Sequence, residues 1–169
     1  MKTFKTILAA VLFLSATSAA VSQENLTATA SASASIIVEV EVEKLQDINF
    51  GELVLNTTAN MNVVTGTNSN MNGTPLAGKF SVEATQYASV GISWETGDLT
   101  HVGSDFTLVY TPQVARTTDA EAESGAAFTE GNFIASGVDF FLVGGTLVVP
   151  EGSPAGEYTG SFTLTAEIN

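Results

Sequence analysis

Apolar and polar side chains alternate along most of this chain, and this period of two constrains the fold more than any other feature. The clearest run extends from Ala28 to Val42, where even positions are apolar and odd positions are Thr or Ser, then Glu, with Ile37 as the exception. Because successive side chains of a strand point to opposite faces, the run predicts one apolar and one solvated face. No stretch has a convincing 3.6-residue period, so we expect strands throughout.

Further runs with strand character are separated by segments rich in Gly, Pro and Asn, residues that interrupt strand pairing. These runs span residues 61–64, 79–85, 89–95, 105–111, 138–149 and 158–168. A break is expected at Gly144–Gly145, and a short helix is an alternative for residues 120–128. Seven or eight short strands separated by turns predict an all-β fold, an antiparallel β-sandwich, rather than alternating strands and helices.

Residues 1–22 have the layout of a secretory signal peptide, with two lysines, an apolar run over residues 7–14 and then small residues. That run is too short to cross a bilayer, so we expect cleavage and no membrane span. The remainder is expected to consist of an Ala/Ser/Thr-rich N-terminal extension, residues 23–35, and a single sandwich domain, residues 36–169.

The charge and residue types of the chain exclude several function classes. Five Lys and Arg stand against 18 Asp and Glu, and a net charge of −13 argues against binding nucleic acid. The absence of Cys removes disulfides, thiolate metal sites and cysteine nucleophiles. The single histidine, His101, lies in a predicted turn and has no obvious catalytic partners. We therefore expect no enzyme and no cofactor.

Carboxylate and aromatic side chains give weaker indications. Glu39, Glu41 and Glu43 would follow one strand face at a spacing of about 7 Å, which is typical of a solvated face, with calcium binding as the alternative. The acidic loop 119–123 is interpreted in the same way. Trp94 shares a face with apolar neighbours and is expected in the core, whereas Tyr87 precedes that strand and is the better candidate for an exposed aromatic.

The Ala28–Val42 run is too long for one strand of a small sandwich. At ~3.3 Å per residue it would extend about 46 Å, whereas a domain of this size is roughly 40 Å across. The run therefore either bends or acts as a tether, or its first part leaves the domain and adds to a neighbouring subunit. Its bulky half suits the core of its own domain, and its small half suits a shallow groove elsewhere. The candidate donor-strand residues are Ala28, Ala30, Ala32, Ala34, Ile36, Val38, Val40 and Val42.

The last run is the candidate receiver of such a strand. It places a small or apolar residue at every second position. An edge strand with such an apolar face promotes aggregation unless another segment covers it. The alternative is a central strand of a closed sandwich. The candidate groove-edge residues are Tyr158, Phe162, Leu164, Ala166 and Ile168.

Two segments carry a family resemblance. One is Leu-Gln-Asp-Ile-Asn-Phe-Gly-Glu-Leu at 45–53, and the other combines Val-Gly-Gly-Thr-Leu-Val-Val-Pro at 143–150 with Ala-Gly-Glu-Tyr-Thr-Gly-Ser-Phe-Thr-Leu-Thr at 155–165. The chain resembles the bacterial secreted domain-of-unknown-function family 4402 and is similar to spore-coat-U and fimbrial-subunit domains. The resemblance implies no catalytic residue. It implies an immunoglobulin-like, pilin-like sandwich that lacks one strand, which the N-terminal strand of a neighbour supplies.

Together these features predict a non-catalytic structural or adhesive protein of the bacterial cell surface, a fimbria-like subunit that associates by β-strand addition. Its expected partners are copies of itself, other surface-fibre subunits and a periplasmic chaperone. It would be secreted across the inner membrane to the periplasm, the outer-membrane surface or the exterior. The alternative function is a monomeric secreted carbohydrate-binding module.

Overall fold

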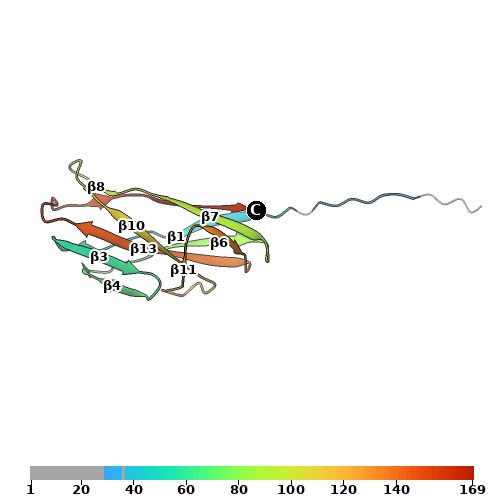
Figure 1. Ribbon diagram of the computed structural model, residues 1–169, viewed down its shortest axis with the longest axis horizontal. Helices are drawn as coiled ribbons and strands as arrows, with labels where there is room; N and C mark the ends of the chain where they lie inside the picture. Colours follow the sequence, from blue (N-terminus) through green and yellow to red (C-terminus); the bar gives the residue numbers. More distant parts are fainter. Residues whose placement is uncertain (1–28, 36) are drawn as a thin grey trace, which may run out of the picture. The chain divides into compact units, whose positions relative to one another are not determined.

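The computed structural model describes residues 29–35 and 37–169 (Figure 1). The predicted signal peptide, Ala28 and Ile36 lie outside the described residues. Residues 29–35 form no strand and are exposed, and the compact unit extends from Ile36 to Asn169. In the described part of the chain there is no helix, and therefore none that is long and apolar enough to cross a membrane.

The compact unit is built entirely of strands and their connections. In chain order the strands are β1 (Val40–Gln46), β2 (Glu52–Leu53), β3 (Thr57–Asn62), β4 (Thr67–Ser69), β5 (Met71–Asn72), β6 (Gly78–Ala84), β7 (Ser89–Thr96), β8 (Leu99–His101), β9 (Thr107–Leu108), β10 (Tyr110–Thr117), β11 (Ala126–Phe128), β12 (Gly131–Ile134), β13 (Val138–Val149), β14 (Tyr158–Thr159) and β15 (Phe162–Ile168).

These strands form an antiparallel β-sandwich. The main sheet has the order β1-β6-β13-β10-β11, and β3 extends it by pairing with the second half of β13 and with β4. The facing sheet has the order β12-β7-β15. Two small sheets, β14-β8-β9 and β2-β5, complete the fold. The expected all-β sandwich is confirmed.

The core lies between the two main sheets and divides into two large apolar clusters. The first joins side chains of β6, β7 and β13, among them Val82, Ile92 and Phe141. The second surrounds Leu108, Tyr110 and Leu147 at the other end of the sandwich. Buried residues alternate with half-buried or exposed polar ones along β6, as the period of two predicts.

The expected break at Gly144–Gly145 is wrong, because β13 is continuous from Val138 to Val149. At these glycines the strand exchanges one neighbour, β6, for another, β3. A Cβ on Gly144 would lie 2.4 Å from the carbonyl oxygen of Met61, and one on Gly145 would lie 2.1 Å from that of Thr111. Glycine permits this close approach of backbones, so here it marks packing and not a turn.

Two other expectations also need correction. The alternative helix at residues 120–128 is wrong, since the segment ends in β11, and a Cβ on Gly125 would lie 2.5 Å from the carbonyl oxygen of Arg116. The run 158–168 is not one strand. It changes neighbours at Gly160–Ser161, so that β14 pairs with β8 and β15 pairs with β7.

Candidate functional site

Two strands lie side by side on one rim of the sandwich without pairing, and we call this the open rim. β1 ends the main sheet and pairs with β6, whereas β15 ends the facing sheet and pairs with β7. The two strands are neighbours in space, yet no ladder joins them among the described residues. An unpaired strand edge presents a row of backbone donors and acceptors, so the open rim is a ready template for another strand.

The register shows which backbone groups of β15 are free. The N–H of Asn169 donates to the carbonyl of Ser89, and the N–H of Gly97 donates to that of Ser161. In an antiparallel ladder such hydrogen-bonded pairs alternate with non-bonded ones, so the odd residues of β15 bond to β7. The N–H and C=O groups of the even residues therefore point to the open rim, and these residues are Phe162, Leu164, Ala166 and Ile168.

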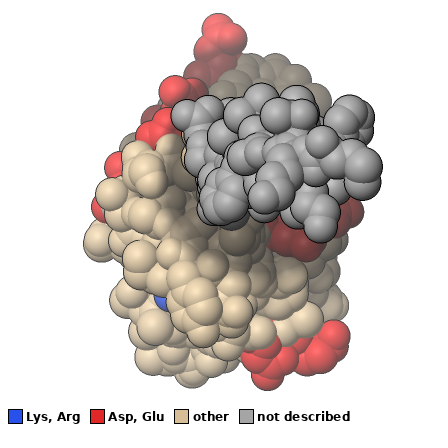
Figure 2. Space-filling model, turned by 90° about the vertical axis from the view of Figure 1, so that its right-hand side faces the viewer, with Lys and Arg blue, Asp and Glu red and all other residues tan. Residues whose placement is uncertain are grey.

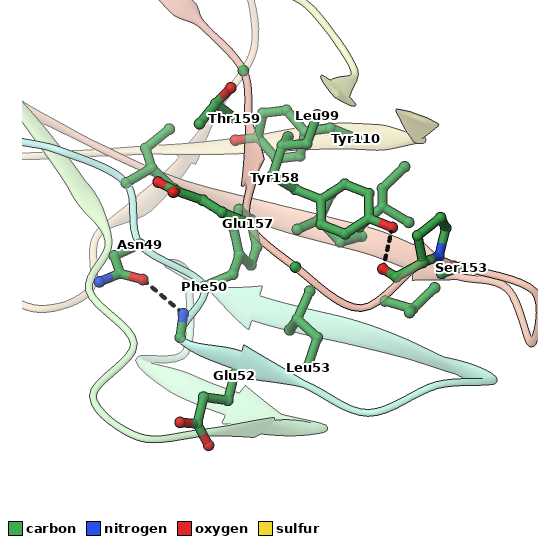
Figure 3. A pocket seen from close by; sticks show the side chains of 18 of the residues that line it. Asn49, Phe50, Glu52, Leu53, Leu99, Tyr110, Ser153, Glu157, Tyr158 and Thr159 are labelled. Carbon is green, nitrogen blue, oxygen red and sulfur yellow. Dashed lines mark hydrogen bonds between the residues drawn. The ribbon is translucent and has the colours of Figure 1, made fainter. Parts of the chain in front are cut away.

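The open rim widens into a groove where the chain after β1 turns away from β15. The ladder between β1 and β6 has a bulge between Lys44 and Gln46, after which Asn49 bridges to Leu76 and β2 pairs with β5. The resulting cavity, which we call the rim groove, has a volume of about 960 Å³. Segment 47–55 forms one wall, and segment 153–162 forms the other (Figure 3).

The floor of the rim groove is apolar and belongs to the second core cluster. Leu108, Tyr110, Leu147 and Val149 lie at its base and are buried. The Tyr110 hydroxyl donates to the carbonyl of Gly144 over 2.7 Å, and burial raises the pKa of this hydroxyl well above its usual range. Tyr110 is therefore a neutral structural residue at the base of the groove.

Side-chain hydrogen bonds hold the walls in place. The Asn49 side chain accepts from the N–H of Gly51, and the Tyr158 hydroxyl donates to the carbonyl of Pro154 over 2.7 Å (Figure 3). His101 packs edge-on against Tyr158, its Nδ1 accepts from the N–H of Gly103, and its Nε2 lies 3.3 Å from the carbonyl oxygen of Ala155. His101 thus supports a wall of the groove, and it lies at the end of β8 rather than in the predicted turn.

The mouth of the rim groove is acidic. Asp47, Glu52 and Glu157 are exposed among its lining residues, which include no Lys or Arg. Three carboxylates disfavour an anionic occupant, while the apolar floor favours an apolar one. An uncharged segment with small or apolar side chains fits both properties.

The structure separates the candidate donor-strand residues into two groups. Ala30, Ala32 and Ala34 are exposed and in no strand, and Ala28 and Ile36 lie outside the described residues. Val38 also precedes β1, so β1 takes up only Val40 and Val42. Val40 packs against the first core cluster, whereas Val42, which pairs with the buried Val82, is 36% exposed.

The candidate groove-edge residues lie along one rim. Tyr158 belongs to β14 and lines the rim groove, together with Phe162 at the start of β15. Leu164 is buried, Ala166 is half-buried, and Ile168 is 36% exposed at the far end. All four residues of β15 share the inward face, and the alternative of a central strand does not hold for β15.

The opposite wall, segment 47–55, was not among the sequence candidates. It is irregular, with β2 only two residues long, so it carries no periodic signal. Segment 150–156 is one of the connections rich in Gly and Pro, and its composition alone predicts only a turn. Gly156 could have marked it as a site of close packing, since a Cβ there would lie 2.4 Å from His101 Nε2.

The remaining sequence candidates lie away from the rim groove or support it. Glu41 and Glu43 are exposed on β1, and Tyr87 is 77% exposed, as expected for a loop aromatic. Trp94 packs partly buried against the core and stacks on Phe162, with ring centroids 6.3 Å apart. Within residues 29–35 and 37–169, no three His, Asp or Glu side chains gather closely enough to hold a metal ion.

Comparisons with known proteins assign the sandwich to a family. A search of curated proteins gave no match. A family model described as a domain of unknown function, DUF4402, matches residues 40–167, from the first residue of β1 to the penultimate residue of β15. The match therefore includes both strands of the open rim and both walls of the rim groove, and leaves the extension outside. Since it covers most of the sequence, the chain belongs to the DUF4402 family.

Proposed function

We propose that this protein is a non-catalytic structural subunit, exported to the bacterial cell surface, whose copies associate by β-strand addition. The segment before β1 in one copy, residues 23–39, adds to β15 of another copy and covers its rim groove. One observation carries the proposal. The free backbone groups of β15 face an unpaired rim directly beside an apolar groove of about 960 Å³.

The donor segment is long enough for this role. Residues 23–39 would extend about 55 Å as a strand, at ~3.3 Å per residue. β15 extends from Phe162 to Ile168, or about 23 Å on the same scale. Pairing along all of β15 therefore leaves residues at both ends of the donor to enter the rim groove and to cross between copies.

The side chains of the donor suit the groove. A strand added at the open rim places every second side chain over the core and the others in solvent. Ala30, Ala32 and Ala34 alternate with serines in the required way. Because Phe162 and Leu164 already fill much of the space beneath, small side chains suit this position better than large ones.

Charge also favours contact between copies through this segment over contact through the surfaces of their sandwiches. Residues 36–169 contain 17 of the 18 acidic residues and only three basic ones, so two sandwiches repel each other. No charged residue lies between Asn25 and Val38. The extension can therefore approach the acidic mouth of the rim groove of a second copy, whereas an acidic strand would be repelled.

Further partners follow from the same chemistry. Before assembly, an open rim beside an apolar groove invites aggregation. A periplasmic chaperone that lends a temporary strand would prevent it, and other surface-fibre subunits whose extension contains a similar uncharged stretch would compete for the same groove. An adhesive role is compatible with such a fibre.

The proposal is tested on the full chain from residue 23 by sedimentation at increasing protein concentration. We expect self-association, and we expect Ala30→Asp with Ala32→Asp to weaken it at least about tenfold, because two carboxylates would then be buried over the apolar core beside β15. The matched control is Ser31→Asp with Ser33→Asp. It adds the same charge on the solvent-facing side of the donor and should weaken association much less. A wild-type chain that stays monomeric at every concentration would contradict the proposal.

A second candidate function is carbohydrate binding. It is favoured by the lining of the rim groove, which includes the Tyr158 ring and three carboxylates that can accept hydrogen bonds from sugar hydroxyls. Because Trp94 stacks on Phe162 at the edge of the groove, its fluorescence should report an occupant. A change on adding oligosaccharides, but not on adding a peptide of residues 23–39, would favour this candidate over strand addition.

A further inference from the structure

We propose that Asn72 is a site of spontaneous chemical modification, at which the side-chain amide becomes a carboxylate without an enzyme. The modification goes beyond the proposed function, and only its effect on the rim groove rests on that function. The chain contains several asparagines, and Asn72 is the only one that glycine follows. Because Gly73 has no side chain, its backbone nitrogen is unobstructed and can approach the side chain of the residue before it.

The structure leaves Asn72 and Gly73 accessible. Asn72 is exposed at the end of β5, whereas Met71 packs against the second core cluster. Gly73 has a φ of 78°, and a Cβ there would have no atom within 4 Å. Among the described strands, β5 pairs only with β2, over two residues of each. Because so short a ladder opens locally at low cost, this segment can leave strand geometry while the sandwich stays folded.

Other asparagine side chains are held by hydrogen bonds to the backbone, and a larger residue than glycine follows each of them. Examples are Asn49, Asn62 and Asn70. Asn68 is the best match to Asn72, because it is also exposed on a short strand, β4, but Ser69 follows it. The chain therefore supplies Asn68 as an internal reference for the reactivity of Asn72.

The reaction has two balanced steps. The backbone nitrogen of Gly73 attacks Cγ of Asn72, the new N–C bond closes a five-membered succinimide, and the side-chain amino group leaves with the displaced proton as ammonia. Water then adds to one of the two ring carbonyls and opens the ring. Opening at one carbonyl gives aspartate. Opening at the other gives isoaspartate, in which the main chain passes through Cβ and is one carbon longer.

Both products act on one wall of the rim groove. Asn72 pairs with Glu52 of β2, which belongs to the wall segment 47–55. Like charges directly opposite each other destabilise a strand pair, and the longer main chain of isoaspartate would also disturb the register. The surface offers little compensation, since visible acidic groups outnumber basic ones on the face in Figure 2. Conversion therefore weakens the support that β5 gives this wall and leaves the bridge from Asn49 to Leu76.

The modification is tested on the full chain from residue 23, kept folded at mildly alkaline pH, digested and analysed by tandem mass spectrometry. We expect Asn72 to convert at least about tenfold faster than Asn68, with both isomers present. Gly73→Asn tolerates a positive φ and should slow the conversion of Asn72 about fivefold or more. Conversion of Asn72 no faster than that of Asn68 would overturn the proposal.

A destabilised variant shows whether local opening is sufficient. Arg116→Met breaks the ion pair with the buried Asp139 and should raise the population of globally unfolded chain more than about a hundredfold. If Asn72 reacts through local opening of β5, its rate in this variant should stay within about twofold of the wild-type rate. A rate that rises with the unfolded population would show that the folded protein protects Asn72, and the proposal would fail.

The effect on the rim groove is tested with Asn72→Asp and with Asn68→Asp, which adds the same charge on β4. The receiving chain also carries Ala30→Asp and Ala32→Asp, so that it cannot donate. Binding of a synthetic peptide of residues 23–39 should weaken about fivefold with Asn72→Asp and stay within about twofold with Asn68→Asp. Equal binding would refute the effect on the wall and leave the modification site standing. If no receiving chain binds the peptide, strand addition fails, whereas the conversion of Asn72 is measured without it.

Discussion

The two long rims of this sandwich differ in how the edges of the two sheets are connected. At the open rim, β1 and β15 lie beside each other without pairing. At the opposite rim, which we call the closed rim, the chain passes directly from β11 in the main sheet to β12 in the facing sheet. The connection between these two strands is only Thr129–Glu130, so the backbone itself covers that side of the core.

Side chains reinforce the closed rim. Arg116 makes two hydrogen bonds to one carboxylate oxygen of the fully buried Asp139, at 3.0 and 2.6 Å, and its guanidinium lies 4.4 Å from the centre of the Phe133 ring. The other carboxylate oxygen accepts from the N–H of Ser136. Three phenylalanines pack edge to face beneath this pair, namely Phe128, Phe133 and Phe141.

The comparison teaches that the open rim is not a general weakness of a small sandwich. The same chain closes one rim with a backbone crossing, a buried ion pair and aromatic packing. On the other it leaves a strand edge, an acidic mouth and a groove of about 960 Å³. The predictions below test whether stability depends on the closed rim and whether the open rim is free to bind.

The largest effect should come from Arg116→Met. The change leaves the carboxylate of Asp139 buried without its cation, and losing one partner of such a pair costs about 3–5 kcal/mol. Urea denaturation should show this loss in the free energy of unfolding. As a control, adding Asp139→Leu removes the buried charge and should recover part of the stability. A loss below about 1 kcal/mol would mean that the ion pair does not seal this rim.

A smaller effect is expected from Gly156→Ala in the wall of the rim groove. The new Cβ would meet His101 Nε2, and the φ of 151° is strained for any other residue. We expect a loss of about 1–3 kcal/mol in the free energy of unfolding. Gly152→Ala in the same loop is the control, since a Cβ there has no atom within 4 Å. Equal free energies of unfolding for the two variants would show that the wall of the rim groove can rearrange around the new Cβ without loss of stability.

Amide hydrogen exchange should reveal the free edge residue by residue. The N–H groups of Phe162, Leu164, Ala166 and Ile168 point to the open rim, so they should exchange at least about tenfold faster than those of Thr163, Thr165 and Glu167. NMR measures these rates directly. Adding the peptide of residues 23–39 should slow the even residues selectively. Equal protection along the strand would mean that the rim is already paired.

The smallest effect should come from Lys44→Met at the open rim. Lys44 pairs with Asp47, but both side chains are largely exposed, and such ion pairs contribute less than about 1 kcal/mol. Urea denaturation alongside Arg116→Met would compare an exposed ion pair on one rim with a buried one on the other. A loss as large as that of Arg116→Met would show that the open rim is stabilised more strongly than its exposure indicates.

The sequence predicts the regular parts of this fold well. Alternation placed strands at residues 79–85 and 89–95, where β6 and β7 lie, because a half-buried strand needs that pattern. The prediction failed where the same residue type is found in two kinds of local structure. Gly144 and Gly145 resemble a turn but permit close backbone packing, and the Ala- and Glu-rich segment before β11 has helix propensity that tertiary packing overrides.

Only half of the candidate site could be predicted. The residues of β15 follow the period of two and were identified, whereas segment 47–55 is irregular and takes its position from pairing with residues distant in sequence, such as the bridge from Asn49 to Leu76. The free edge was not predictable either. Whether a strand is central or at an edge depends on the order of strands in the sheet, which alternation does not encode.

The continuity of residues 37–39 with β1 has a mechanical consequence. β1 is held by a ladder to β6, whose hydrogen bonds lie perpendicular to the strand. Tension applied along the extension would therefore load these bonds together in shear instead of peeling them apart one at a time. In a chain of subunits joined in this way, the backbone hydrogen bonds of the edge strands would carry the tension, without any covalent link between copies.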